Sequence, residues 1–144
     1  TVFRQTLFAE FEREIHGRAE RGEALTSESF CGLWRDLNSE YYGRCVELDG
    51  EIEMEWARIP HFYSPFYVYQ YATGYSAATA LSRGILDEGE PAVRRYMGFL
   101  KRGSSAPVLE VLRDAGVDMA GPGPVKRTVD LFRSTVEELE ELLA

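Results

Sequence analysis

The sequence predicts an all-α fold. Apolar residues recur at spacings of three and four through most of the 144 residues, which is the period of one face of a helix. Proline and glycine residues divide the chain into segments of helical length, and no internal repeat or domain-sized linker is present. We therefore expect a bundle of about six helices in a single domain that comprises residues 1–144.

The first two helices are indicated by periodicity and by caps. An amphipathic pattern predicts a first helix that ends near Gly17 to Gly22; its apolar residues are Phe3, Leu7, Phe8, Phe11 and Ile15. Thr26 and Ser27 are N-cap candidates for a second helix, which we expect to end before Gly43. Residues 45–60 fit either a short hairpin around Asp49-Gly50 or a turn or two of helix over residues 51–58, and we favour the helix.

The segment HFYSPFYVYQYATG, residues 61–74, leads into the next predicted helix. Ser64 is a suitable N-cap, and Pro65 suits the first helical position because its missing N–H would be unpaired there. We expect this helix to reach about Leu86 and to lie buried among its neighbours, since small residues such as Ala77 and Ala80 allow close approach.

Three further helices are predicted from their prolines. One begins at Pro91 and reaches about Lys101, the next begins around Ser105 and Pro107 and stops at Gly116, and the last begins at Pro124. The last helix carries an apolar stripe beside a glutamate-rich face; the stripe comprises Val136, Leu139, Leu142 and Leu143.

The composition excludes several classes of partner. The formal net charge of −8 argues against nucleic acid or an anionic membrane surface, because both attract clustered lysine and arginine. No run of apolar residues is long enough to cross a membrane, and charged residues interrupt the N-terminal segment too often for a signal peptide. Cys31 and Cys45 lack the spacing of a thiol-based zinc site, so we expect two reduced thiols in a cytoplasmic protein.

The tyrosines of residues 61–74 allow two interpretations. In the first, Tyr63, Tyr67, Tyr69 and Tyr71 pack in the core, with their hydroxyls bonded to backbone carbonyls. In the second, some of them join His61 and donate hydrogen bonds into a cleft, where they stabilise an oxyanion or hold a peptide carbonyl. Spacing alone does not decide between the two.

Four segments resemble, in order, the C-terminal part of the oligoendopeptidase F family, zinc metallopeptidases of the thimet-oligopeptidase superfamily. They read TVFRQTLFAEFEREIH, EWARIPHFYSPFYVYQYATGYSAATAL, FLKRGSS and VLRDAGVDM, and they span essentially the whole chain. The resemblance implies an almost wholly helical fold whose two halves enclose a substrate channel, cytoplasmic location, and cleavage of short peptides at internal bonds.

The resemblance also implies roles for individual residues. His61 and the nearby tyrosines would face the catalytic zinc from the opposite wall of the channel. We expect Tyr69 and His61 to act as catalytic hydrogen-bond donors to the tetrahedral intermediate, and Tyr63 and Tyr67 to bind the intermediate or the substrate backbone. Arg58 has the fork that binds a substrate carboxylate, although an arginine in this position also suits a structural salt bridge.

The zinc motif of the family is missing from this chain. The family binds zinc through HExxH and a later glutamate, whereas the two histidines here, His16 and His61, are far apart. His16 and Glu20 share a helix face but supply only two ligands, so we expect no metal on this chain and zinc only in the complete enzyme. The preceding N-terminal part of the same polypeptide would then be the partner of this segment.

A different class of function is also consistent with the sequence. A free-standing helical module could use an aromatic groove to bind a peptide or a partner helix without any chemistry. Such a module would need none of the absent metal ligands.

Overall fold

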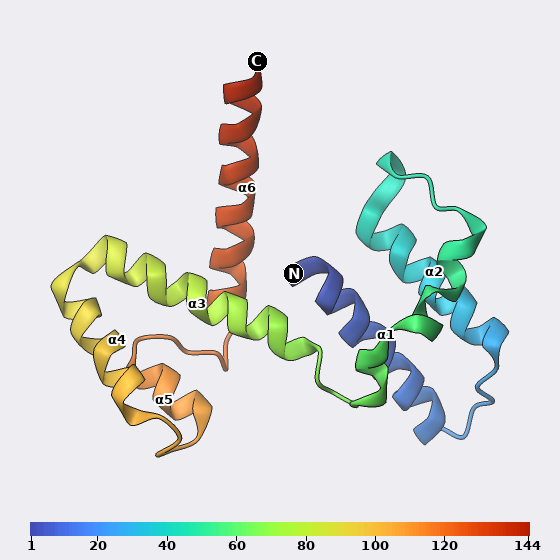
Figure 1. Cartoon of the computed structure of the whole chain (residues 1–144), viewed down its shortest axis with the longest axis horizontal. Helices are drawn as coiled ribbons and strands as arrows, with labels where there is room; N and C mark the ends of the chain where they lie inside the picture. Colours follow the sequence, from blue (N-terminus) through green and yellow to red (C-terminus); the bar gives the residue numbers. More distant parts are fainter. The chain divides into compact units, whose positions relative to one another are not determined.

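The computed structural model describes all residues from 1 to 144 and confirms the all-α class. It contains six α-helices, three short 3₁₀ helices and no strand. The residues form two compact units, which we describe separately: unit 1 is Thr1–Ala72 and unit 2 is Thr73–Ala144 (Figure 1). The single domain expected from the sequence stays a prediction.

The first helix, α1 (Val2–Glu20), supplies the centre of the unit 1 core. Leu7 and Phe11 are almost fully buried against Trp34 of the second helix, and the ring centroids of Phe11 and Trp34 lie 5.0 Å apart, edge to face. Edge-to-face packing of this kind adds to the free energy gained by burying the two rings. The amphipathic pattern thus places α1 as expected.

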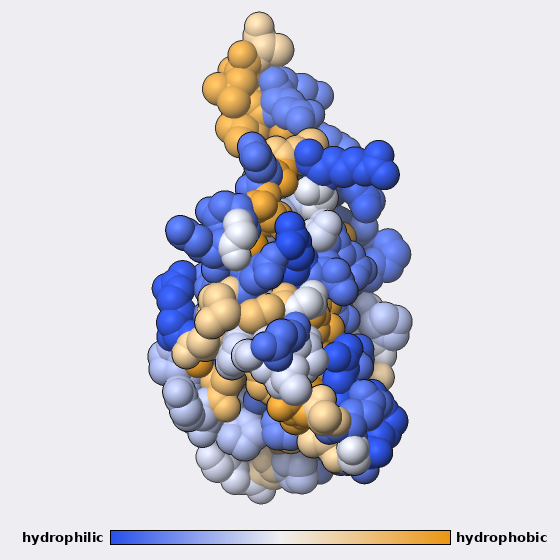
Figure 2. Space-filling view, turned by 90° about the vertical axis from the view of Figure 1, so that its right-hand side faces the viewer, coloured by the Kyte–Doolittle hydropathy of each residue, from blue (hydrophilic) through white to orange (hydrophobic).

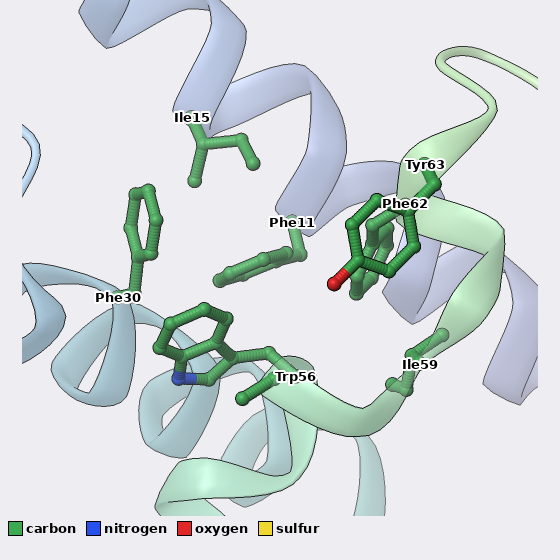
Figure 3. Close-up of a pocket in the computed structure, with 8 residues that line it drawn as sticks. Phe11, Ile15, Phe30, Trp56, Ile59, Phe62 and Tyr63 are labelled. Carbon is green, nitrogen blue, oxygen red and sulfur yellow. The ribbon is translucent and has the colours of Figure 1, made fainter.

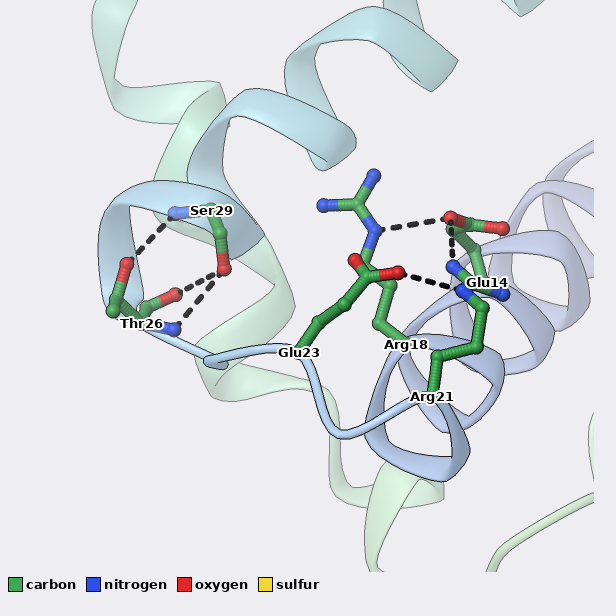
Figure 4. A network of polar contacts seen from close by, with 6 residues as sticks. All are labelled: Glu14, Arg18, Arg21, Glu23, Thr26 and Ser29. Carbon is green, nitrogen blue, oxygen red and sulfur yellow. Dashed lines mark hydrogen bonds and ion pairs between the residues drawn. The ribbon is translucent and has the colours of Figure 1, made fainter.

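The second helix, α2 (Ser27–Tyr42), begins at the predicted cap. The Thr26 hydroxyl accepts a hydrogen bond from the Ser29 N–H at 3.2 Å, and the Ser29 hydroxyl accepts one from the Thr26 N–H at 3.1 Å (Figure 4). This reciprocal capping box satisfies two backbone donors that a helix start leaves unpaired.

Ion pairs tie the end of α1 to the turn that leads to α2. Glu14 accepts from the Arg18 Nε at 2.9 Å, and the Arg21 Nε donates to Glu23 at 2.6 Å (Figure 4). Arg18 is partly buried and the other three side chains are exposed, so these are surface ion pairs that add little to stability.

The segment between Cys45 and Pro60 forms helix rather than a hairpin. The 3₁₀ helix Gly43–Cys45 leads into it, and it contains the 3₁₀ helix Gly50–Arg58, which the Asp49 side chain caps by accepting from the N–H groups of Glu51 and Ile52, each at 3.0 Å. The preference for helix over residues 51–58 is confirmed, although the helix is of the tighter 3₁₀ type.

The predicted start of the third helix is wrong. His61 and Tyr63 lie in the 3₁₀ helix Pro60–Tyr63, and α3 (Tyr69–Glu88) begins four residues after Pro65. Phe66 interrupts the helix because its φ is 58°, in the left-handed region, and its N–H donates at 2.7 Å to the buried Glu12 carboxylate. Tyr67 therefore precedes α3 instead of lying on it.

Unit 2 contains the remaining helices close to their predicted positions. They are α4 (Glu90–Arg102), α5 (Val108–Asp114) and α6 (Gly123–Leu143), and each begins within a residue or so of its proline. One face of α3 is buried in unit 2, where Ala77 and Ala80 pack with Val117. The small residues give the close approach expected of them.

The apolar stripe of α6 is exposed. Leu142 and Leu143 keep 77% and 78% of their surfaces accessible, and Val136 and Leu139 are also exposed. Figure 2 shows hydrophobic residues beside hydrophilic ones at the top of the view, where α6 ends.

Candidate functional site

His61 is positioned by its neighbours in the unit 1 core. Ile59 is buried, and the ring of Phe62 lies 5.3 Å from that of Phe11. Because Ile59 and Phe62 anchor the short 3₁₀ helix Pro60–Tyr63 to the core, His61 is held at the surface of the unit, partly exposed.

His61, Tyr67 and Tyr71 form a compact group, which we call the His61 cluster. The His61 and Tyr67 rings are nearly parallel, with centroids 5.9 Å apart. The Tyr71 ring stands edge-on to both, at 5.7 Å from His61 and 5.6 Å from Tyr67. The Tyr71 hydroxyl lies 3.4 Å from His61 Nε2, so an imidazole and two phenols present polar hydrogens close together.

The electrostatics of the cluster favour a neutral Tyr71. A hydrogen bond with the Tyr67 side chain is the main cause of a raised pKa for the Tyr71 phenol, and partial desolvation and the Tyr67 charge add to it. The raised pKa extends to higher pH the range in which the Tyr71 phenol keeps its proton and can donate it.

Tyr69 faces another direction. It is the first residue of α3, and the two positions between it and Tyr71 correspond to about 200° around the helix axis. Its side chain is half-exposed and lies on the side of α3 opposite to Tyr71. The structure thus groups two of the five predicted site residues, His61 and Tyr67, and adds Tyr71, which was not among the five.

Tyr63 lies beside a small aromatic pocket. The pocket encloses about 170 Å³, and Figure 3 shows the Tyr63 hydroxyl pointing toward the rings that line it. The lining residues are Phe11, Ile15, Phe30, Trp56, Ala57, Ile59, Phe62 and Tyr63. Tyr63 itself is 85% exposed, so its ring is available to a ligand.

Arg58 makes the ion pair that the sequence left open as an alternative. Its guanidinium donates to Glu55 Oε1 at 2.6 Å, and Arg4 donates to the same oxygen at 2.6 Å. Glu55 is buried, so the two arginines compensate a carboxylate that has lost most of its water. The Arg58 side chain remains 77% exposed, which leaves part of its fork accessible.

The interpretation that these tyrosines fill the core is wrong. Tyr63, Tyr67, Tyr69 and Tyr71 are all exposed, and the core of unit 1 is built from phenylalanine, tryptophan and aliphatic side chains instead. Tyr71 is the least exposed of the four, and its ring lies against His61 and Tyr67 instead of in the core.

Metal ligands are not gathered anywhere in the chain. No group of three or more histidine, cysteine, aspartate or glutamate side chains could hold a metal ion, and the His16 ring packs against Phe66 with centroids 4.6 Å apart. The residues present therefore do not fit a metal centre of their own. Both cysteines are free thiols. None of the helices is both long and apolar enough to span a membrane.

Comparison with known proteins identifies the family. The sequence profile of Peptidase family M3 matches residues 1–131. "Oligopeptidase PepF" of Bacillus subtilis is 56% identical over 143 residues, which cover 99% of this chain and 21% of that protein. The plasmid-encoded "Oligoendopeptidase F" of Lactococcus lactis subsp. cremoris is 47% identical over 99% of this chain and 24% of its own length.

A solved structure agrees with this assignment. The crystal structure of oligoendopeptidase-F from Enterococcus faecium superposes with a TM-score of 0.96 at 48% identity, covering 99% of this chain and 27% of that one. The chain thus spans between a fifth and about a quarter of the length of these relatives. By the profile match and by these identities, the chain belongs to Peptidase family M3.

Proposed function

We propose that the chain is the C-terminal, substrate-facing part of a zinc-dependent oligopeptidase that hydrolyses internal bonds of short peptides. The family membership supports the reaction class. The His61 cluster at the surface of unit 1 is the observation that carries the proposal, because two phenols and an imidazole gathered in one place suit the stabilisation of developing negative charge.

The chemistry assigned to these residues follows from the reaction. When a peptide carbonyl is attacked, its oxygen becomes an oxyanion. Hydrogen-bond donors placed around that oxygen stabilise the transition state, and one such donor lowers the barrier by about 3 kcal/mol in other enzymes. Tyr69 and His61 are the proposed catalytic donors. Tyr63, Tyr67 and Arg58 are the proposed substrate-binding residues, and Tyr71 supports His61 and Tyr67 within the cluster.

The metal and the rest of the site would come from outside this chain. Because no ligand group for a metal exists here, we propose that zinc is bound by the preceding N-terminal part of the same polypeptide. The complete enzyme would act in the cytoplasm on short peptides. This chain alone is expected to be inactive.

A binding module is the second candidate, and a specific groove favours it. In unit 2 a mainly apolar hollow of about 470 Å³ is lined by small residues of α3, including Gly74 and Ala78, and by the rings of Tyr96 and Phe99 of α4. A helix or an apolar peptide would fit such a surface without catalysis.

Activity measurements on two proteins test the proposal. The isolated chain with excess zinc should cleave no quenched fluorescent peptide above background, whereas the complete polypeptide should cleave it and lose activity with a chelator. Chelator-sensitive turnover by the isolated chain, or none by the complete polypeptide, would refute the assignment. Peptide binding by the isolated chain without turnover in either protein would favour the module.

A further inference from the structure

We propose that Glu12 is a positioning residue for the His61 cluster. Its buried carboxylate holds the turn before α3 in the conformation that brings Tyr67 and Tyr71 beside His61. The effect on peptide hydrolysis rests on the proposed function, whereas the effect on the geometry of the cluster is independent of it.

Phe66 has an unusual backbone conformation. It is the one residue other than glycine with a positive φ, 58°, a region that side chains with a Cβ seldom occupy. Burial of its ring does not explain the conformation, since the Phe66 side chain is 52% exposed. Another contact must therefore hold the turn.

The contact that holds the turn comes from Glu12. The Phe66 N–H donates to Glu12 Oε1 at 2.7 Å, although the two residues are 54 positions apart in the chain. Glu12 is only 3% exposed, and a hydrogen bond to an ionised carboxylate away from water is among the stronger kinds. One turn further along α1, the His16 ring packs on the Phe66 ring at 4.6 Å. Helix α1 thus holds both the backbone and the side chain of Phe66.

The turn at Phe66 leads directly into the tyrosines of the His61 cluster. Tyr67 lies between Phe66, held by Glu12, and Val68, which is fully buried in the unit 1 core. With both neighbours fixed, the Tyr67 backbone is held beside His61, and its ring lies nearly parallel to the His61 ring. The Tyr71 N–H then donates to the Val68 carbonyl at 3.2 Å in the first turn of α3, which places the Tyr71 ring against both.

The experiment first removes the Glu12 acceptor and then replaces Phe66 by a residue that adopts positive φ without it. In the complete polypeptide, Glu12→Met keeps the length of the side chain but cannot accept the Phe66 N–H. We expect kcat to fall by about tenfold or more with KM changed much less, as for lost transition-state contacts. Adding Phe66→Gly to Glu12→Met should restore much of the lost kcat, because glycine adopts positive φ freely. Adding Phe66→Ala should not restore it, because alanine does not.

A structural readout separates the two proposals. In protein with isotope-labelled histidine, the His61 ring resonance, assigned with His61→Gln, should lose the shift caused by Tyr67 in Glu12→Met and regain it with Phe66→Gly. If the wild-type polypeptide shows no peptidase activity, the proposed function fails, but this resonance still tests Glu12. An unchanged resonance, or equal rescue by glycine and alanine, would overturn the role of Glu12.

A second variant covers loss of folding. If Glu12→Met does not fold, Glu12→Asp retains the charge but shortens the reach, and the same difference between Phe66→Gly and Phe66→Ala is expected with it. Glu12→Gln, which keeps an oxygen acceptor, should behave much like the wild type. Equal behaviour of Glu12→Gln and Glu12→Asp in both readouts would count against the proposal.

Discussion

Single hydroxyl groups distinguish the roles of the tyrosines. Tyr69 is the proposed donor to the oxyanion, but it lies on the side of α3 opposite to Tyr71, while His61 is grouped with Tyr67 and Tyr71. Removing one phenol oxygen while keeping the ring is therefore the most direct test of which hydroxyl acts in catalysis.

Tyr69→Phe in the complete polypeptide should lower kcat by about a hundredfold, with KM and melting temperature nearly unchanged, because the hydrogen bond forms fully only in the tetrahedral intermediate. Steady-state kinetics and thermal unfolding measure this. The control is Tyr41→Phe, which loses only a 2.8 Å hydrogen bond from its hydroxyl to Glu10 and should cost about 1 kcal/mol of stability without affecting kcat. If Tyr67→Phe lowers kcat and Tyr69→Phe does not, the donor to the oxyanion is Tyr67 instead of Tyr69.

The Tyr71 phenol gives a prediction on pH. Its pKa is raised chiefly by the hydrogen bond with Tyr67, so Tyr67→Phe should bring the Tyr71 pKa back toward its ordinary value. The folded chain favours the neutral phenol, so this contribution to stability is complete below the ordinary phenol pKa and is lost as pH rises through the raised one. Ultraviolet titration of wild type, Tyr67→Phe and Tyr71→Phe measures it. Tyr41 also titrates late, because burial and Glu10 raise its pKa, so Tyr71→Phe should lower the amplitude of the late titration without abolishing it, and an unchanged amplitude would contradict the assignment.

At the scale of elements, helix starts are decided by local chemistry where a cap is present. The Thr26 box is made within four residues, and the helices of unit 2 begin at prolines, so short-range rules are sufficient for them. The start of α3 depends instead on a contact between Phe66 and Glu12, which short-range rules do not contain.

The capping box makes a prediction about stability. Thr26→Ala removes the acceptor for the Ser29 N–H and should lower the free energy of unfolding by about 1 kcal/mol. Ser39→Ala, at an exposed position of the same helix, should change it little because alanine favours helix. Chemical denaturation of both variants provides the comparison, and equal effects would show that the cap contributes nothing measurable.

The candidate site was predictable from the sequence only in part, for the same reason. The neighbourhood of His61 and Tyr67 was expected, because the motif places them within a few residues. Tyr71 was not predicted as part of the site, since its place beside His61 depends on the packing of the turn before α3 and not on the spacing of the motif. The roles of Tyr69, Tyr63 and Arg58 stay predictions. The all-α class was the easier inference, because it needs only the periodicity of many residues and not the conformation of one.

At the scale of the whole molecule, the exposed apolar surface is larger than an isolated chain of this size tolerates well. The stripe on α6 and the groove in unit 2 are both open to solvent. The relatives are about four times longer, in line with a share of 24% of one such protein, so we expect the remainder of the polypeptide to cover part of this surface.

The isolated chain should consequently self-associate. Leu139→Glu, in the middle of the α6 stripe, should shift the population toward monomer, whereas Glu138→Gln beside it should not, because only the former removes apolar area from the stripe. Light scattering over a concentration series and binding of an apolar dye are the measurements. A strictly monomeric wild-type chain that binds no dye would contradict this prediction.

The aromatic core of unit 1 also determines what an optical experiment detects. The chain has two tryptophans, Trp34 and Trp56, and both belong to residues 1–72, in contact with the same group of phenylalanines. Indole emission therefore follows the melting of unit 1 alone, and unit 2 contributes to far-ultraviolet circular dichroism without contributing to that signal. The fluorescence transition and the circular dichroism transition coincide if the two units unfold together and separate if they unfold independently. The comparison needs no label on the chain.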